Sequence, residues 1–226
     1  MDQAGLTQYL VGREPEAVIR TFAMMAYNPA IGRVLEGGSV VRFADLMADE
    51  IPKIYSALIE GSFDDWHSRM CARILADFKT AKGEKLSYGQ AQKPLNVFLK
   101  VYVDWAKLPA REVAEKLTPA LHCPLDSVVM KFIKREFPDA YEERIGSVRR
   151  HKLERVAERA REIAGSSSGA VAKRIVGNES SLAAIDKEIY LQWQALFRSL
   201  WPGKPVQLDL IWALERRPSS GEPETV

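Results

Sequence analysis

Apolar residues recur at intervals of three and four along most of the chain, which is the spacing of one face of an α-helix. The pattern predicts helices over residues 14–27, 44–58, 110–117, 146–164 and 178–201, and three more that begin at Ser62, Pro94 and Asp126. Pro52 should kink or split the second helix, because proline lacks the backbone N–H that a helix interior needs. We find no alternating stretch long enough for a strand. The sequence therefore predicts an all-α protein.

Two polar stretches interrupt this pattern. Gly165–Gly169, with three consecutive serines, predicts a turn or mobile loop and is the best candidate for an internal break. From Pro218 onwards the residues are polar and lack periodicity, so we expect residues 218–226 to form a disordered tail. The remaining residues 1–217 are long enough for one helical domain with a sizeable core, or for two small lobes that share one.

Charge changes this picture in one region. The net charge of the 226 residues is only +2, so the molecule as a whole is not a polycation. Between Lys131 and Arg174, however, there are 12 Lys and Arg residues but only 7 Asp and Glu residues, a local excess of 5 positive charges. This region is either a solvated helical face or a surface that follows a phosphate backbone.

Several classes of site and location are disfavoured by what the sequence lacks. Two cysteines and three histidines are too few for a disulfide framework or a histidine-built metal centre, and we expect neither metal nor cofactor. The first residues have neither the basic nor the apolar region of a secretory signal, and no apolar run is long enough to span a membrane. A reduced, monomeric, cytoplasmic protein is the simplest expectation.

Lys93 is the first residue that suggests chemistry. Proline is favoured at the first position of a helix, so Lys93-Pro94 predicts that this lysine lies where the chain enters a helix. The positive end of the helix dipole and partial burial would then disfavour the ammonium form, leaving a free amine that can attack a sugar C1′. The simpler interpretation is an exposed lysine ahead of a helix.

Asp126 is the second such residue. It follows the short loop His122-Cys123-Pro124-Leu125 and is a good N-cap for the helix after it. If it faces Lys93, its carboxylate can deprotonate the amine or stabilise an oxocarbenium ion; otherwise it is only a cap. For His122 we expect a hydrogen bond that shapes this loop, and for His67 a solvated position on the polar side of its helix.

Three segments together resemble helix-hairpin-helix DNA glycosylases, and most of all the archaeal 8-oxoguanine DNA glycosylases. Gln92-Lys93-Pro94-Leu95-Asn96-Val97-Phe98-Leu99-Lys100 is similar to the segment that carries the catalytic lysine of that family. Cys123-Pro124-Leu125-Asp126 is similar to the turn that delivers its catalytic aspartate, and Gln207-Leu208-Asp209-Leu210-Ile211-Trp212 to the C-terminal segment that contacts the extruded base. The dense similarity covers about thirty positions.

The resemblance implies two helical lobes around a central cleft, duplex DNA as the partner, and excision of a modified base. It assigns catalysis to Lys93 and Asp126, and the base pocket to Trp212, Asp209 and Phe98. Phe98 stands one residue further from the lysine than the family pattern expects, which leaves open whether it or Val97 faces the base. For the DNA backbone we expect cationic contacts, from Lys100, Lys107, Arg149, Arg150 and Lys152.

Alternatives remain open for these residues and for the function. Phe98 and Trp212 can be core residues, and Asp209 an ordinary cap. The base can be 8-oxoguanine or a bulkier one, such as a modified cytosine of viral DNA, and a lyase step through a Schiff base can follow excision. The competing functions are a non-catalytic helical nucleic-acid-binding module, and a helical interaction protein that uses Trp193 and Trp201 at a partner surface.

Overall fold

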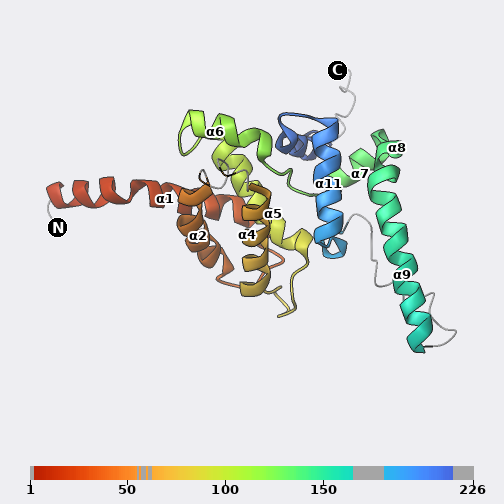
Figure 1. Cartoon of the computed structure of the whole chain (residues 1–226). Coiled ribbons are helices and arrows are strands. Elements are labelled where there is room, and N and C mark those ends of the chain that lie inside the picture. Colours follow the sequence, from red (N-terminus) through yellow and green to blue (C-terminus); the bar gives the residue numbers. More distant parts are fainter. Residues whose placement is uncertain (1–2, 55, 57–59, 61–62, 165–180, 216–226) are drawn as a thin grey trace, which may run out of the picture. The chain divides into compact units, whose positions relative to one another are not determined.

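The computed structural model describes residues 3–54, 56, 60, 63–164 and 181–215. Within these ranges the regular elements are helices, and β-pairing is limited to the isolated bridges Leu35–Thr80 and Lys79–Lys85. The prediction of an all-α fold is confirmed for this part of the chain (Figure 1). The predicted serine loop and the predicted tail lie outside the described residues.

The chain divides into two compact units, which we describe separately. Unit 1 combines Met1–Leu86 with Ala91–Leu121, and unit 2 combines Ser87–Gln90 with His122–Val226. In the described part of the chain, no helix is both long enough and apolar enough to cross a lipid bilayer.

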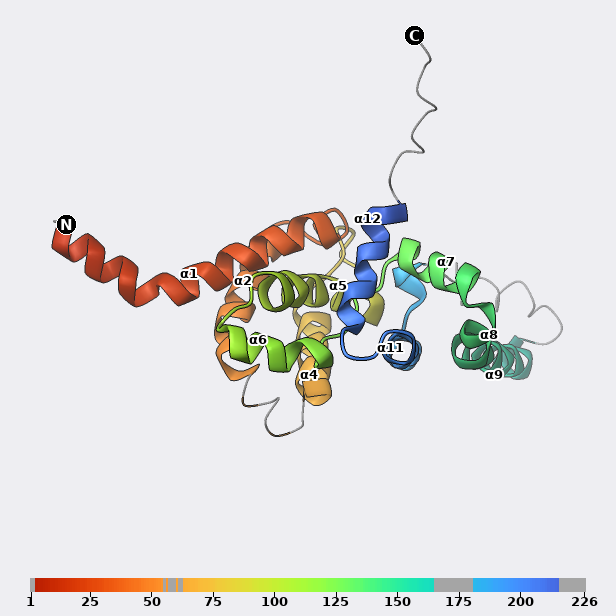
Figure 2. The same cartoon turned by 90° about the horizontal axis from the view of Figure 1, so that it is seen from above.

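Unit 1 is built from α-helices joined by short 3₁₀ and π segments. Its elements are α1 (Gln3–Ile31), α2 (Ser39–Glu50), η1 (Ile51–Lys53), α4 (Phe63–Asp77), α5 (Tyr88–Leu99, of which the first turn is grouped with unit 2), the π-helical η2 (Lys100–Trp105), α6 (Arg111–Leu117) and η3 (Thr118–Ala120). As predicted, Pro52 splits the second helix: α2 ends at Glu50, the 3₁₀ turn η1 follows, and Ile54 and Ser56, the described residues after it in the predicted range, are helical. Helices α1 and α2 pack along each other (Figures 1 and 2).

An aromatic cluster forms the centre of unit 1. The Phe98 ring stacks on Tyr102 with centroids 5.2 Å apart and meets Phe43 edge-on at 6.4 Å. Tyr27 of α1 packs on the other side of this group, 5.2 Å from Phe43. The cluster ties α5 and η2 to α1 and α2, so the apolar face predicted after Pro94 is buried as expected.

Helix α5 begins earlier than predicted, and this changes the position of Lys93. Ser87 caps the helix: its Oγ accepts a hydrogen bond from the Gln90 amide at 3.1 Å, while Gln90 Oε1 accepts one from the Ser87 amide at 2.9 Å. This reciprocal arrangement is a capping box, and it starts the helix before Pro94 is reached. Pro94 therefore lies inside α5, and the prediction that Lys93 stands at a helix entrance is wrong.

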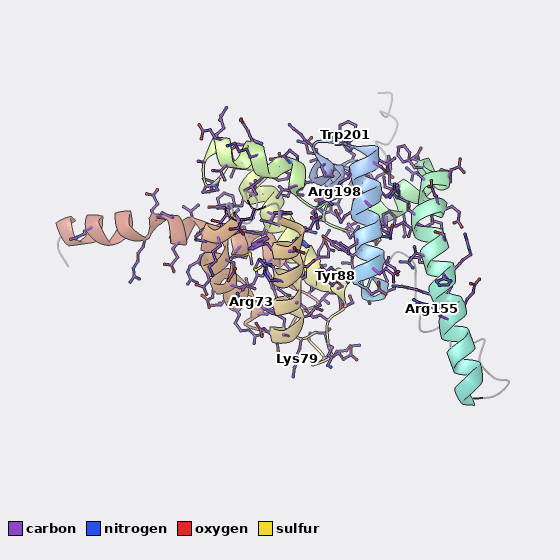
Figure 3. All side chains as sticks on the ribbon, viewed as in Figure 1. Arg73, Lys79, Tyr88, Arg155, Arg198 and Trp201 are labelled. Atoms are coloured by element: carbon purple, nitrogen blue, oxygen red, sulfur yellow. The ribbon has the colours of Figure 1, made fainter. Side chains whose placement is uncertain are left out.

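Unit 2 is the second set of helices. Its elements are α7 (Ser127–Glu136), α8 (Pro138–Tyr141), the π-helical η4 (Glu142–Gly146), α9 (Ser147–Ala164), η6 (Leu182–Ala184), α11 (Lys187–Leu200), η7 (Pro205–Leu210) and α12 (Ile211–Glu215). Helix α11 supplies much of the core: Trp193 lies between Phe197 and Tyr141, with ring centroids 5.5 and 5.6 Å away. Trp193 is thus a core residue and not the partner-facing residue considered above, whereas Trp201 is 53% exposed at the end of α11 (Figure 3).

The predicted helix over 178–201 is shorter in the structure. Residues 178–180 lie outside the described ranges, and Ile185 is extended, so that Asp186 starts α11 by accepting a hydrogen bond from the Ile189 amide at 3.0 Å. The predicted helices over 110–117 and 146–164 are confirmed to within one residue.

A glycine in the first turn of α5 allows this turn to approach the segment before α11. The Gly89 amide donates to Ile185 O at 3.0 Å, and Ser87 Oγ donates to Leu182 O at 2.7 Å. A Cβ on Gly89 would stand 2.4 Å from Leu182 O and 2.7 Å from Ile185 Cβ, which is closer than side chains pack.

We expect Gly89→Ala to destabilise the protein by about 1–3 kcal/mol, because the clash outweighs the better helix propensity of alanine. The measurement is the free energy of unfolding in urea. Gly37→Ala is the matched control, since its Cβ would meet nothing within 4 Å. Equal stability of the two variants would show that Gly89 does not lie this close to Leu182 and Ile185.

Candidate active site

Lys93 lies in the interior of α5 and is only 7% exposed. A lysine is rarely buried to this extent unless its amine has a partner or a function, because removing an ammonium from water is costly. The dipole argument for its reactivity does not apply, since the free N–H groups of a helix lie in its first turn, which here is formed around Gly89. Its burial is the feature that now distinguishes this lysine.

The same side of the helix carries other buried polar residues. Gln92 and Asn96 are fully buried, and Lys100, at the start of η2, is nearly so. These positions follow each other at intervals of four, so they form one stripe along the helix, with Lys93 beside it. The Lys100 ammonium lies 4.7 Å from the centre of the Trp105 ring, a cation–π contact. Unit 1 therefore contains a stripe of buried polar side chains along α5 and the start of η2.

His67 of α4 contacts this stripe, contrary to its predicted solvated position. It is fully buried on α4, and its Nε2 lies 2.7 Å from Asn96 Oδ1. The prediction failed because His67 does not lie on the polar side of α4: it shares the buried face of this helix with Phe63, Trp66 and Met70, where it pairs with Asn96 of α5. Periodicity within one helix cannot reveal such a pairing.

Asp126 has the predicted position at the start of α7. Its Oδ1 accepts a hydrogen bond from the Val128 amide at 2.7 Å, and its backbone is extended, as an N-cap requires. The prediction that Asp126 caps this helix is confirmed. Lys93 belongs to unit 1 and Asp126 to unit 2, so their action as a pair stays a prediction.

Helix α11 holds the loop that leads to Asp126. The Gln194 side chain pairs with the backbone of Cys123 twice: its Oε1 accepts from Cys123 N, and its Nε2 donates to Cys123 O, each at 2.9 Å. One turn earlier on α11, the Tyr190 hydroxyl lies 2.7 Å from His122 Nδ1. All four residues are buried, so this clamp fixes residues 122–123 just ahead of the carboxylate. The predicted hydrogen bond of His122 is confirmed, and Gln194 is a residue that sequence reasoning missed.

We expect Gln194→Leu to destabilise the protein by about 2–4 kcal/mol, because it leaves both backbone groups of Cys123 buried without this partner. Chemical denaturation measures the change. Gln192→Leu, on a half-exposed position of the same helix, should stay within about 0.5 kcal/mol of the unmodified chain. A stable Gln194→Leu protein would mean that the clamp does not hold the loop.

The predicted base-pocket residues differ in their surroundings. Trp212, on α12, is 40% exposed, and Asp209 is buried in η7; both belong to unit 2. Phe98 is fully buried in the aromatic cluster of unit 1, and contact with an extruded base would require the packed rings to separate. Val97, the alternative to Phe98, is half-exposed.

The cationic residues predicted to contact the DNA backbone are either buried or paired with carboxylates. Lys100 and Arg149 are buried, and Lys107 pairs with Asp104 at 3.2 Å. Arg150 forms an ion pair with Glu142. Phosphate contacts at these positions would have to replace protein partners.

Lys152, the last residue of this predicted set, bridges two carboxylates, those of Asp186 and Glu188. Burial alone would raise the pKa of Asp186, but hydrogen bonds from Lys152 and the Ile189 amide together lower this pKa below its ordinary value. Its ion pairs give Lys152 a structural role within unit 2, linking α9 to the start of α11.

The described residues contain no cluster of three or more His, Cys, Asp or Glu side chains that could hold a metal ion. No protein-family model matches the chain, and no curated protein or solved structure is significantly similar to it.

Proposed function

We propose that this protein is a DNA glycosylase that excises a modified base, with Lys93 as the nucleophile and Asp126 as its carboxylate partner. The observation that carries the proposal is the burial of Lys93 inside α5, beside a stripe of buried polar side chains. A second observation, the clamp by α11 on the loop before Asp126, supports a fixed place for the carboxylate. The similarity of three segments to helix-hairpin-helix glycosylases supplies the reaction.

In the proposed reaction the base is first turned out of the DNA stack, at a cost of a few kcal/mol. Asp126 accepts a proton from the Lys93 ammonium, and the free amine attacks C1′ of the deoxyribose. The bond between C1′ and the base breaks, and its electron pair leaves with the base, which then takes up a proton. The bond between C1′ and O4′ then breaks, O4′ takes up the proton that Nζ loses, and an iminium bond forms between C1′ and Nζ. The proposed chemistry requires no cofactor, because an amine and a carboxylate supply both nucleophile and base.

The iminium can also promote strand cleavage. Loss of a proton from C2′ would allow the bond between C3′ and its phosphate oxygen to break, which is β-elimination. Hydrolysis of the iminium would then return the free lysine. The proposed enzyme is therefore a glycosylase with an associated lyase activity, and 8-oxoguanine or a hypermodified cytosine is its substrate.

The test is incubation of the protein with duplexes that each carry one modified base. Free base is measured by mass spectrometry and the covalent adduct by borohydride reduction, with an unmodified duplex as the control. The proposal predicts release of at least one modified base, together with an adduct. Release without an adduct would mean that water is the nucleophile and would contradict the role of Lys93.

Two other results of this experiment would point to the alternative functions. Binding of duplex DNA without release of any base in the panel indicates the non-catalytic nucleic-acid-binding module. If the protein has no affinity for DNA even at low ionic strength, where phosphate contacts are strongest, a helical interaction protein remains.

A further inference from the structure

Three buried side chains form a hydrogen-bonded chain from α4 to α5 at the turn that carries Lys93. His67 Nε2 lies 2.7 Å from Asn96 Oδ1, and Asn96 Nδ2 donates to Gln92 Oε1 at 2.7 Å. All three residues are fully buried. Gln92 immediately precedes Lys93 in the sequence, and Asn96 follows it by three positions, so the chain brackets the lysine on α5.

The Asn96 amide sets the donors and acceptors of this chain. Because the Asn96 amide nitrogen donates to Gln92, its oxygen is the atom that faces the histidine, and a carbonyl oxygen can only accept. His67 must therefore carry a proton on Nε2. The other ring nitrogen, Nδ1, lies 3.8 Å from Cys71 Sγ, which can donate its thiol proton to it. The donors and acceptors thus run in one order from His67 to Gln92.

The backbone of α5 is weakened at this same place. Pro94 follows Lys93 directly and cannot donate the hydrogen bond that would reach the carbonyl of Gln90. The regular part of the helix also ends soon afterwards, because the π-helical η2 begins at Lys100. With fewer bonds of its own, this turn depends more on contacts from a neighbouring helix for its orientation.

A chain of buried polar groups stabilises the packing of two helices no more than apolar side chains of similar shape do, and often less. What polar contacts add is a single allowed orientation. We propose that His67, Asn96 and Gln92 are positioning residues, which set the rotation of α5 and so the direction of the Lys93 amine. This inference rests on the proposed function, in which that amine must reach C1′.

The test compares two replacements of His67 in the full-length protein. His67→Phe keeps an aromatic ring but loses the donor, whereas His67→Gln keeps an N–H group close to the position of Nε2. Base release is measured in a single turnover at saturating protein, together with the Kd for a duplex that the enzyme cannot cleave. Catalytic geometry is sensitive to small displacements, so we expect His67→Phe to lower the single-turnover rate about 100-fold. Its Kd should stay within about 2-fold of that of the unmodified protein, and His67→Gln should keep at least about a fifth of the rate.

The matched control is Thr118→Val. Thr118 is also buried in unit 1, and its Oγ1 donates to Ala114 O at 2.8 Å, so this variant loses one buried hydrogen bond away from Lys93. It should keep the full rate even though it is less stable. An equal loss of rate in Thr118→Val, or in His67→Gln, would assign His67 a structural role only and overturn the inference.

Two further results separate the possible failures. If the unmodified protein releases no base, the proposed function fails and this inference with it. If the unmodified protein is active and His67→Phe is equally fast, only the inference fails. Should His67→Phe not fold, Gln92→Met removes the last acceptor of the chain with little change of shape. It should slow release about 10-fold, and an unchanged rate would overturn the inference.

Discussion

Replacing Lys93 with methionine should abolish both the covalent adduct and base release. Methionine is close to lysine in length, suits a helix interior and fits an apolar core, so the fold should persist. What disappears is the only atom that forms the proposed bond to C1′. We expect the rate of base release to fall by at least about 10³-fold, to the residual rate that DNA binding gives without the nucleophile. The measurements are single-turnover base release and borohydride trapping.

Two more variants serve as controls for this result. Lys116→Met removes an exposed lysine from α6 in the same unit and should leave both activities unchanged. Lys93→Arg keeps the positive charge but has no free amine, so it should bind DNA and yet form no adduct. Base release by Lys93→Arg would mean that residue 93 acts through its charge and is not the nucleophile.

The second large effect should come from Asp126→Asn. Asparagine caps a helix as well as aspartate does, so the hydrogen bond from the Val128 amide can persist while the negative charge is lost. Without the carboxylate, the proposed mechanism loses its acceptor for the Lys93 proton and its counter-charge for the positive charge that develops at C1′. We expect single-turnover release to fall about 10²- to 10⁴-fold, with little change in the free energy of unfolding.

The structure offers a closely matched control for this variant. Asp186 caps α11 in the same unit and in the same way, accepting from the Ile189 amide. Asp186→Asn should therefore retain base release, apart from the effect of its lost ion pair with Lys152. If both caps tolerate asparagine without loss of activity, Asp126 is only a cap and the proposed mechanism lacks its base.

The features that were predicted well from sequence depend on neighbouring residues. The sequence places one helix over 110–117 and starts another at Asp126, and the structure has α6 and α7 there to within one residue. The start of α5 was misplaced because Pro94 outweighed a competing local signal. Ser87-Tyr88-Gly89-Gln90 has the serine and glutamine spacing of a capping box, and this signal was available in the sequence.

The features that were missed join residues far apart in the chain. Gln194 lies 71 positions after Cys123, and His67 lies 29 positions before Asn96. Neither pairing has a periodic signal, because each depends on which helix packs against which. Phe98 and Trp193 illustrate the same limit, since aromatic residues at helical spacing fit a core and a ligand site equally well.

The most direct test of the central claim is to identify the residue that becomes attached to DNA. The protein is incubated with a duplex whose modified base it releases, reduced with borohydride and digested, and the modified peptide is sequenced by mass spectrometry. We predict that the deoxyribose fragment is bound to Lys93 and that Lys93→Met protein yields no modified peptide. Attachment to another residue, with Lys93 unmodified, would contradict the account.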